Sequence, residues 1–134
     1  MTHSSSGDLP LTNEHDIVLS RQAVRRMTQE LGFSLVDQTK MVTAASELAR
    51  NTLIYGGGGG LTWIMLQEGA KRGLRLKFED QGPGIPNLEL ALTDGWSSGT
   101  GLGLGLTGAR RLVNEFDIES TVGAGTRVTI TRWK

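Results

Sequence analysis

The chain has 134 residues, the size of a single compact domain. It contains no cysteine, which excludes disulfide frameworks, thiolate metal sites and cysteine nucleophiles. Lys+Arg and Asp+Glu both total 14, and this balance gives no indication of binding to nucleic acid or to an anionic membrane. The apolar runs are too short to span a bilayer and the N-terminus lacks a signal-peptide pattern, so we expect a cytoplasmic protein.

The N-terminal quarter of the chain predicts a tail, a strand and a helix. Residues 1–12 are polar and indicate a flexible tail, so we expect one domain over residues 13–134. Residues 16–19, an aspartate followed by three apolar residues, predict a short strand. Ser20 is then placed to cap a helix that ends at Gly32.

A second helix is marked by its cap and by its apolar spacing. Ser34 and Asp37 have the spacing of a capping box, and the helix is predicted to extend to about Tyr55. Its buried stripe is predicted to comprise Met41, Ala44, Ala45, Leu48 and Thr52. Five consecutive glycines, residues 56–60, then predict a flexible connection.

The second half of the chain predicts two hairpins separated by a loop and a helix. Four strands are expected, at residues 61–66, 74–79, 116–121 and 126–133. Residues 81–103 are rich in glycine, proline and serine and predict one long loop, and residues 105–115 predict a helix. This order indicates an α/β (α+β) two-layer sandwich, with a mixed, largely antiparallel sheet and helices on one face.

Glu47 and Asn51 are the first candidates for chemistry. They are four residues apart on the second predicted helix, so they share one face about one turn apart. A carboxylate can accept a proton from an attacking hydroxyl group, and an amide oxygen suits a hard cation such as Mg²⁺. The alternative is that both residues belong to a solvated helix edge.

Asp80 begins the second candidate motif, Asp-Gln-Gly-Pro-Gly-Ile, directly after a predicted strand. A carboxylate in this place can accept a hydrogen bond from an exocyclic amino group such as adenine N6. The two glycines of the motif allow the backbone to approach a flat ring closely. The alternative is an ordinary turn, in which aspartate, glycine and proline are the commonest residues.

The third candidate motif has glycine at every second position from Gly99 to Gly105, where a predicted helix begins. Free backbone N–H groups and a helix N-terminus favour phosphate oxygens. Residues 103–108 also match the dinucleotide fingerprint G-x-G-x-x-G, but that fingerprint requires a preceding strand, and residues 93–98 do not predict one. Neither a Walker-type P-loop nor the motif set of eukaryotic-type protein kinases occurs.

Taken in order, the three motifs resemble those of the ATP-binding fold shared by gyrase B, Hsp90, sensor histidine kinases and MutL, the GHKL superfamily. Residues 46–51, 79–86 and 94–97 look like the anti-sigma-type serine/threonine kinases, and are most similar to the stressosome switch kinases of the RsbT type. The resemblance extends from residue 14 to the end of the chain. It implies a Bergerat-type ATP-binding fold.

The resemblance also implies roles for individual residues. Glu47 would be the general base for a serine hydroxyl group on a protein substrate. Asn51 would hold Mg²⁺ against the phosphates of ATP or ADP, and Asp80 would bind adenine N6. The other implied nucleotide contacts are Gly82, Gly84, Ile85, Thr100, Gly101, Leu102, Gly103, Leu104, Gly105 and Thr126.

The function implied by the resemblance is that of an ATP- and Mg-dependent serine/threonine protein kinase acting as a partner switch. Such kinases phosphorylate a serine on a STAS-domain antagonist, and the released kinase activates a PP2C-type phosphatase. A STAS-containing stressosome scaffold is a further expected partner, whereas neither nucleic acid nor a membrane is expected. The alternative is a non-catalytic ATP-binding switch, similar to an anti-sigma factor, that sequesters partner proteins.

Overall fold

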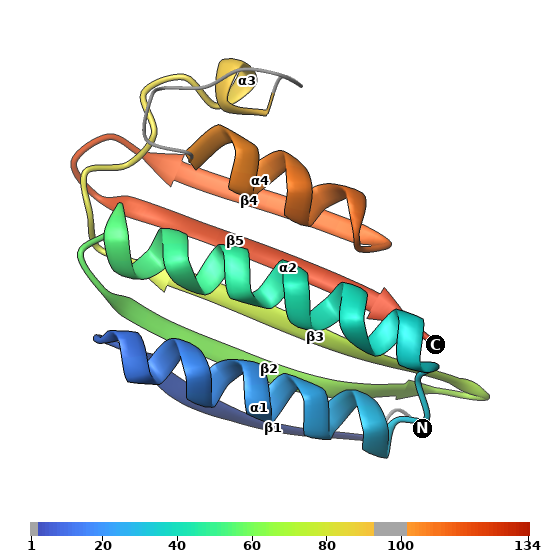
Figure 1. The fold of residues 1–134 in the computed structure, drawn as a ribbon. Coiled ribbons are helices and arrows are strands. Elements are labelled where there is room, and N and C mark those ends of the chain that lie inside the picture. The colour runs from blue at the N-terminus through green and yellow to red at the C-terminus, as the bar shows by residue number, and fades with distance from the viewer. Residues whose placement is uncertain (1–2, 93–101) are drawn as a thin grey trace.

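The computed structural model describes residues 3–92 and 102–134, which form one sheet and one layer of helices (Figure 1). The elements follow one another as β1 (His3–Leu11), α1 (Glu14–Glu30), α2 (Leu35–Ile54), β2 (Gly59–Glu68), β3 (Lys71–Asp80), α3 (Leu88–Ala91), α4 (Leu102–Arg111), β4 (Glu115–Thr121) and β5 (Gly125–Trp133). In this part of the chain, no helix combines the length and the apolar character needed to cross a membrane.

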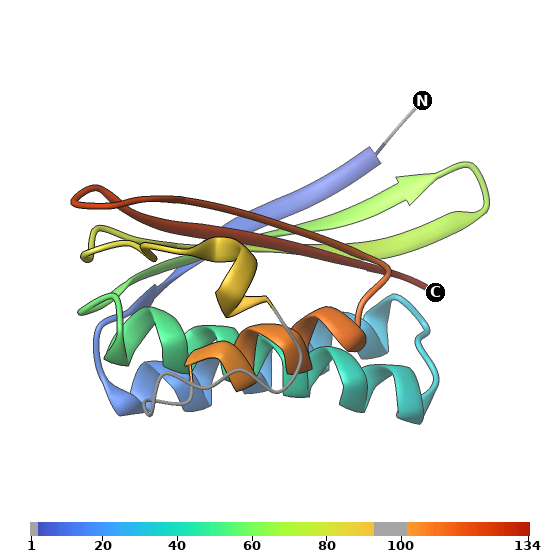
Figure 2. The same cartoon turned by 90° about the horizontal axis from the view of Figure 1, so that it is seen from above.

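The five strands form a single sheet in the order β1-β2-β3-β5-β4. Every neighbouring pair in the described sheet is antiparallel. The helices α1, α2 and α4 lie side by side on one face, and the view from above separates the two layers (Figure 2). The predicted α/β two-layer sandwich is therefore confirmed.

The core lies between the sheet and the helices and follows from strand alternation. On β3, Leu74, Leu76 and Phe78 are buried, whereas the intervening side chains face the open side of the sheet. The apolar stripe of α2 packs on them, with Ala44 and Ala45 fully buried. The predicted stripe of the second helix and the four predicted strands are confirmed.

The N-terminal segment is a strand, so the prediction of a flexible tail over residues 1–12 is wrong. Residues 3–11 pair with β2 along its whole length. Leu11 is fully buried and Leu9 packs partly against the core, while the serines of the segment lie on an edge strand. Polarity alone suggested disorder because pairing with a strand some fifty residues later leaves no local signal in the sequence. The domain therefore begins before residue 13.

The predicted strand at residues 16–19 is also wrong, because this run belongs to α1. Asn13 caps the helix, and its side-chain oxygen accepts a hydrogen bond from the backbone N–H of Asp16 at 2.9 Å. Of the apolar run, Ile17 is buried whereas Val18 and Leu19 are exposed. One buried residue per turn is the helical pattern, so the cap expected at Ser20 lies inside the helix.

The segment predicted as one long loop, residues 81–103, is partly helical. It contains α3, and α4 begins at Leu102 and ends at Arg111 rather than spanning residues 105–115. Leu106 and Ala109 are buried in the core, and this packing outweighs the low helix propensity of the glycines.

Candidate functional site

A cavity of ≈ 200 Å³ opens between the C-terminal half of α2, the start of α4 and the sheet. Its walls are mostly apolar, with a few polar groups converging from different elements. The lining residues are Leu48, Asn51, Thr52, Tyr55, Gly56, Phe78, Asp80, Pro83, Gly84, Ile85, Leu106, Thr126 and Val128. This combination is typical of a small-molecule site.

Asn51 presents an unpaired amide on the wall of this cavity. It lies in the last turn of α2, and its Nδ2 atom is buried without a hydrogen-bond partner among the residues that the structure describes. Gly105 of α4 approaches so closely that a Cβ atom there would lie 3.2 Å from both Nδ2 and Oδ1 of Asn51. A buried amide without a partner destabilises a fold, so this position fits a side chain that binds a ligand.

Glu47 lies one helical turn before Asn51 and is not among the lining residues of the cavity. Its side chain is partly buried, and a Cβ atom on Gly105 would lie 3.4 Å from its Oε2 atom. Gly105 thus faces Glu47 and Asn51 together. The absence of a side chain at this position leaves room for the carboxylate and the amide beside α4.

Asp80 ends β3 on the opposite side of the cavity. Its Oδ1 atom accepts hydrogen bonds from the backbone N–H of Gly82 at 2.9 Å and of Thr126 at 3.3 Å. Among the described residues, no donor is within hydrogen-bond distance of Oδ2. One carboxylate oxygen is therefore fixed by the backbone, and the other remains able to accept a hydrogen bond from a ligand.

The loop after Asp80 is held against the β4–β5 hairpin. The hydroxyl group of Ser120 accepts a hydrogen bond from the backbone N–H of Ile85 at 2.8 Å and lies 2.8 Å from the Thr126 hydroxyl group. Gly84 has φ +78°, and a Cβ atom there would lie 2.4 Å from the carbonyl oxygen of Thr121. The positive φ and the short distance to Thr121 both require glycine at position 84. The backbone of Gly84 lines the cavity.

Five of the sequence-predicted residues line the cavity itself: Asn51, Asp80, Gly84, Ile85 and Thr126. Gly82 donates to Asp80, and Glu47 and Gly105 lie close to Asn51 without lining the cavity. Leu102, Gly103 and Leu104 form the first turn of α4 rather than a loop, and Thr100 and Gly101 lie outside the described residues.

Sequence reasoning missed most of the cavity wall. The missed residues are Leu48, Thr52, Tyr55, Gly56, Phe78, Pro83, Leu106 and Val128. Helical spacing from Asn51 could have found Leu48 and Tyr55, since positions three and four residues apart share a face. Nothing local in the sequence indicates that Val128 of β5 meets α2 across the sheet.

The polar groups fit a Mg²⁺ ion that is shared with a ligand. The described residues contain no group of three or more His, Cys, Asp or Glu side chains able to hold a metal ion on their own. Mg²⁺ is usually held by one or two protein oxygens, with phosphates and water completing the octahedron. The amide oxygen of Asn51, with Glu47 one turn away, would hold the ion in that manner, and the ion would neutralise phosphate charge.

Comparison with known proteins identifies the family. The sequence profile described as "Histidine kinase-, DNA gyrase B-, and HSP90-like ATPase" matches residues 36–134. The chain is 44% identical to the "Serine/threonine-protein kinase RsbT" of Bacillus subtilis (strain 168) over 123 residues, which is 92% of each chain. It is 28% identical to the "Anti-sigma F factor" of Clostridium novyi (strain NT), over 91% of this chain and 89% of that one.

A solved structure has the same fold. It contains the RsbU and RsbW domains of Rv1364c from Mycobacterium tuberculosis, and it matches with a TM-score of 0.64 at 19% identity. The match covers 98% of this chain and 33% of that longer chain. The family predicted from the three motifs is confirmed, and the chain belongs to the histidine kinase-, DNA gyrase B- and HSP90-like ATPases.

Proposed function

We propose that this chain is an ATP- and Mg-dependent serine/threonine protein kinase that acts as a partner switch. The observation that carries the proposal is that Asn51 and Asp80 line one cavity, while Gly105 lies close to both Asn51 and Glu47. A base-binding carboxylate, a metal-binding amide and a proton acceptor are the groups that phosphoryl transfer from ATP requires.

The cavity walls suit an adenine ring. Phe78, Leu106 and Val128 supply apolar surface for the ring faces, and the free Oδ2 atom of Asp80 can accept a hydrogen bond from the 6-amino group. The phosphates would then extend toward Asn51 and the first turn of α4, where free backbone N–H groups and the helix dipole favour negative charge.

Glu47 is placed to activate the protein substrate. Its carboxylate would accept the proton of a serine hydroxyl group while the serine oxygen forms a bond to the γ-phosphorus and the bond to the ADP oxygen breaks. Its position beside Asn51 puts the proton acceptor next to the proposed metal and phosphates. Most of the remaining catalysis comes from holding these groups in line, which a rigid helical turn achieves.

The substrate of this proposal is a serine on a STAS-domain antagonist. A STAS-containing stressosome scaffold and a PP2C-type phosphatase are the other proposed partners, and the proposed location is the cytoplasm. Support comes from the relative named as the RsbT kinase, which is similar over 92% of the chain. The zero formal net charge supports a role without nucleic acid.

The test is transfer of labelled phosphate from ATP to a candidate STAS protein by the wild-type chain and by Glu47→Gln. We expect Glu47→Gln to bind Mg-ATP as the wild type does and to transfer phosphate roughly 10²–10⁴-fold more slowly. Glu30→Gln, at the exposed end of α1, is the matched control and should transfer at the wild-type rate. Unchanged transfer by Glu47→Gln would remove Glu47 from the base role.

The second candidate is a non-catalytic switch that binds ATP in order to hold a partner. The similarity to proteins named as anti-sigma F factors favours it. In that case the chain would bind ATP and form a nucleotide-dependent complex with a partner, but would transfer no phosphate to any STAS protein. The labelled-phosphate experiment therefore separates the two functions.

A further inference from the structure

Gly56 lies where α2 ends, and its backbone conformation does not require glycine. Its N–H donates to the carbonyl oxygen of Asn51 at 3.1 Å. In the five-glycine run, positive φ values occur at Gly57 and Gly58, not at Gly56. Another reason must explain why a side chain is absent at position 56.

The Asp80 side chain occupies the place that a side chain at position 56 would need. A Cβ atom on Gly56 would lie 2.3 Å from Cγ and 2.5 Å from Oδ2 of Asp80. Contacts of this kind are essentially never shorter than 3.0 Å in proteins. A methyl group at position 56 and the present position of the Asp80 carboxylate therefore exclude each other.

Asp80 has no simple way to move aside. Its Oδ1 atom is held by the backbone N–H groups of Gly82 and Thr126. Its own carbonyl oxygen is covered by Gly125, where a Cβ atom would lie 2.1 Å away. The side chain has two torsions, so yielding to a methyl group means breaking the hydrogen bonds to Oδ1 and turning Oδ2 away from its present direction.

We infer that Gly56 positions Asp80 for base selectivity. Because Gly56 has no Cβ atom, the Asp80 carboxylate has enough space to direct its free oxygen, Oδ2, into the cavity. The inference rests on the proposed function, in which Asp80 accepts a hydrogen bond from the base. A purine with an amino group at C6 donates to that oxygen, whereas a purine with a carbonyl group at C6 meets it with a second acceptor. Gly56 thereby contributes to the choice of adenine nucleotides.

A purely structural role for Gly56 makes a different prediction. Gly56 also packs closely on Gly82, since a Cβ atom on Gly82 would lie 2.7 Å from the Gly56 Cα atom. If close packing were its whole role, a substitution would lower stability and would weaken the binding of all nucleotides alike. Selectivity between bases distinguishes the two roles.

The experiment measures the affinities of ATP and ITP, which differ at purine C6, by calorimetry at a temperature where each variant is folded. The wild type should prefer ATP by at least about tenfold, the value of one hydrogen bond to a charged group. Gly56→Ala should lose most of this preference, and we expect the same of Asp80→Ala. Gly60→Ala is the matched control, because its Cβ atom would meet only the carbonyl oxygen of Leu9 at 3.6 Å, and it should keep the preference.

A Gly56→Ala variant that keeps the wild-type ATP preference overturns the inference, whatever its stability. If the wild type binds neither nucleotide, the proposed function fails first; if it binds both equally, the role of Asp80 and this inference fail together. Should Gly56→Ala not fold, adding Asp80→Gly removes the Cβ, Cγ and Oδ2 atoms that collide and should restore folding. A double variant that also remains unfolded overturns the inference.

Discussion

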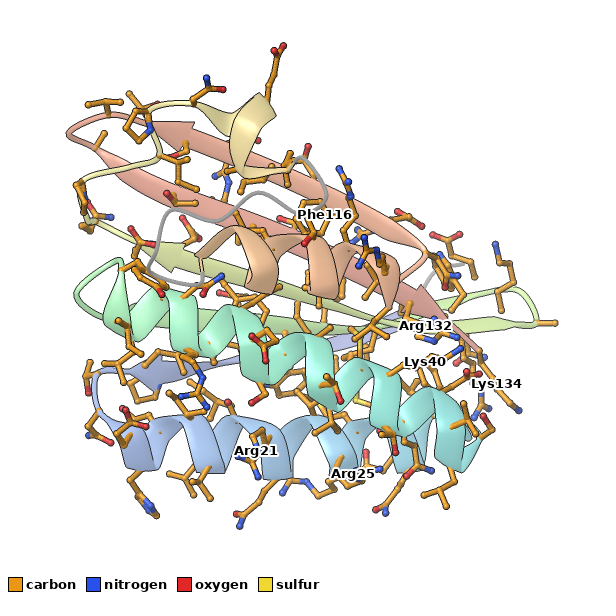
Figure 3. All side chains as sticks on the ribbon, turned by 45° about the horizontal axis from the view of Figure 1, so that its top comes forward. Arg21, Arg25, Lys40, Phe116, Arg132 and Lys134 are labelled. Atoms are coloured by element: carbon orange, nitrogen blue, oxygen red, sulfur yellow. The ribbon has the colours of Figure 1, made fainter. Side chains whose placement is uncertain are left out.

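Polar side chains at the two ends of α2 differ in their hydrogen bonds. At its N-terminal end, Arg132 of β5, labelled in Figure 3, forms an ion pair with Asp37 at 2.7 Å and donates to the carbonyl oxygen of Leu112 at 2.8 Å. Its third nitrogen, Nε, is buried without a hydrogen-bond partner among the described residues. At its C-terminal end, the Nδ2 atom of Asn51 is buried without a partner. One end of the helix is tied to two other elements, and the other end is left open to a cavity.

This difference indicates what each end is for. Arg132 connects β5, the start of α2 and the end of α4, and both groups that it contacts would lose a partner without it. No hydrogen bond between described residues depends on the Asn51 side chain, and the burial of its Nδ2 atom is unfavourable for the isolated protein. We therefore expect substitutions at Arg132 to change stability and substitutions at Asn51 to change ligand affinity.

The largest expected effect is that of Asn51→Ala on nucleotide binding. Loss of a ligand to the ion should weaken Mg-ATP binding roughly 10–100-fold, as for one hydrogen bond to a charged group. The free energy of unfolding without nucleotide should stay the same or rise slightly, because no protein group loses a partner. Calorimetry with Mg-ATP and urea denaturation without nucleotide measure the two quantities.

Asn114→Ala is the matched control for this prediction. The Asn114 Oδ1 atom accepts a hydrogen bond from the backbone N–H of Trp133 at 2.6 Å, so this amide is satisfied by the protein. The control should lose stability and keep its Mg-ATP affinity. Equal Mg-ATP affinity in Asn51→Ala and the wild type would remove Asn51 from the metal site.

The next effect in size is that of Arg132→Met on stability. Methionine keeps much of the apolar stem but leaves Asp37 and the Leu112 carbonyl oxygen without their partner, so we expect a loss of roughly 1–3 kcal/mol in unfolding free energy. Mg-ATP affinity should not change, because the substitution lies at the other end of α2 from the cavity. Denaturation in urea, followed by calorimetry, tests both statements.

Arg127→Met is the control for a surface ion pair. Arg127 contacts Glu119 on the open face of the sheet, where both side chains are well exposed, and such pairs contribute at most about 1 kcal/mol. If Arg132→Met loses less unfolding free energy than Arg127→Met, Arg132 does not stabilise the N-terminal end of α2.

Local patterns predicted the elements in which each turn or strand carries its own signal. The hairpin strands alternate between buried and exposed residues, and Ser34 caps α2 by accepting from the Asp37 N–H at 3.1 Å. The pairing of β1 with β2 lacks such a signal, because the serine-rich edge strand depends on a partner far away in the sequence. The polar segment was therefore predicted as a tail.

The candidate site shows the same limit. Glu47 and Asn51 were predicted because helical spacing places them on one face, and Asp80 because it ends an alternating strand. The five-glycine run was expected to be a flexible connection, yet Gly59 and Gly60 belong to β2 and Gly56 packs against Asp80. These contacts join segments more than twenty residues apart, and glycine has no side chain whose pattern could reveal them.

The smallest effect concerns Asp16, which lies in the first turn of α1 and whose carboxylate is hydrogen-bonded by the protein. Its Oδ2 atom accepts hydrogen bonds from the backbone N–H and the hydroxyl group of Thr12, each at 2.9 Å. The backbone hydrogen bond first, and the hydroxyl second, lower the pKa of Asp16 below its ordinary value of 3.8, against the opposing effect of burial. Thr12 adjoins Gly58, which follows α2, so these bonds fix the chain near the cavity.

A lowered pKa means that the folded protein binds the proton of Asp16 less tightly than the unfolded chain does. The resulting stability is fully present above the unfolded pKa of 3.8 and is lost as the pH falls through the lower folded pKa. Asp16→Asn should therefore be less stable than the wild type at neutral pH, by less than Arg132→Met, and the gap should narrow toward pH 3. Thermal unfolding of both proteins across this range measures the gap.

Mg-ATP affinity at neutral pH decides what Asp16 adds to the comparison. A polar side chain whose hydrogen bonds are made within the protein should stabilise the fold, even when it lies near the cavity. If this is correct, Asp16→Asn will bind Mg-ATP like the wild type. A loss of affinity comparable to that of Asn51→Ala would mean that the whole cavity end of α2 acts as one unit. The unpaired amide of Asn51 would then no longer distinguish the site from its surroundings.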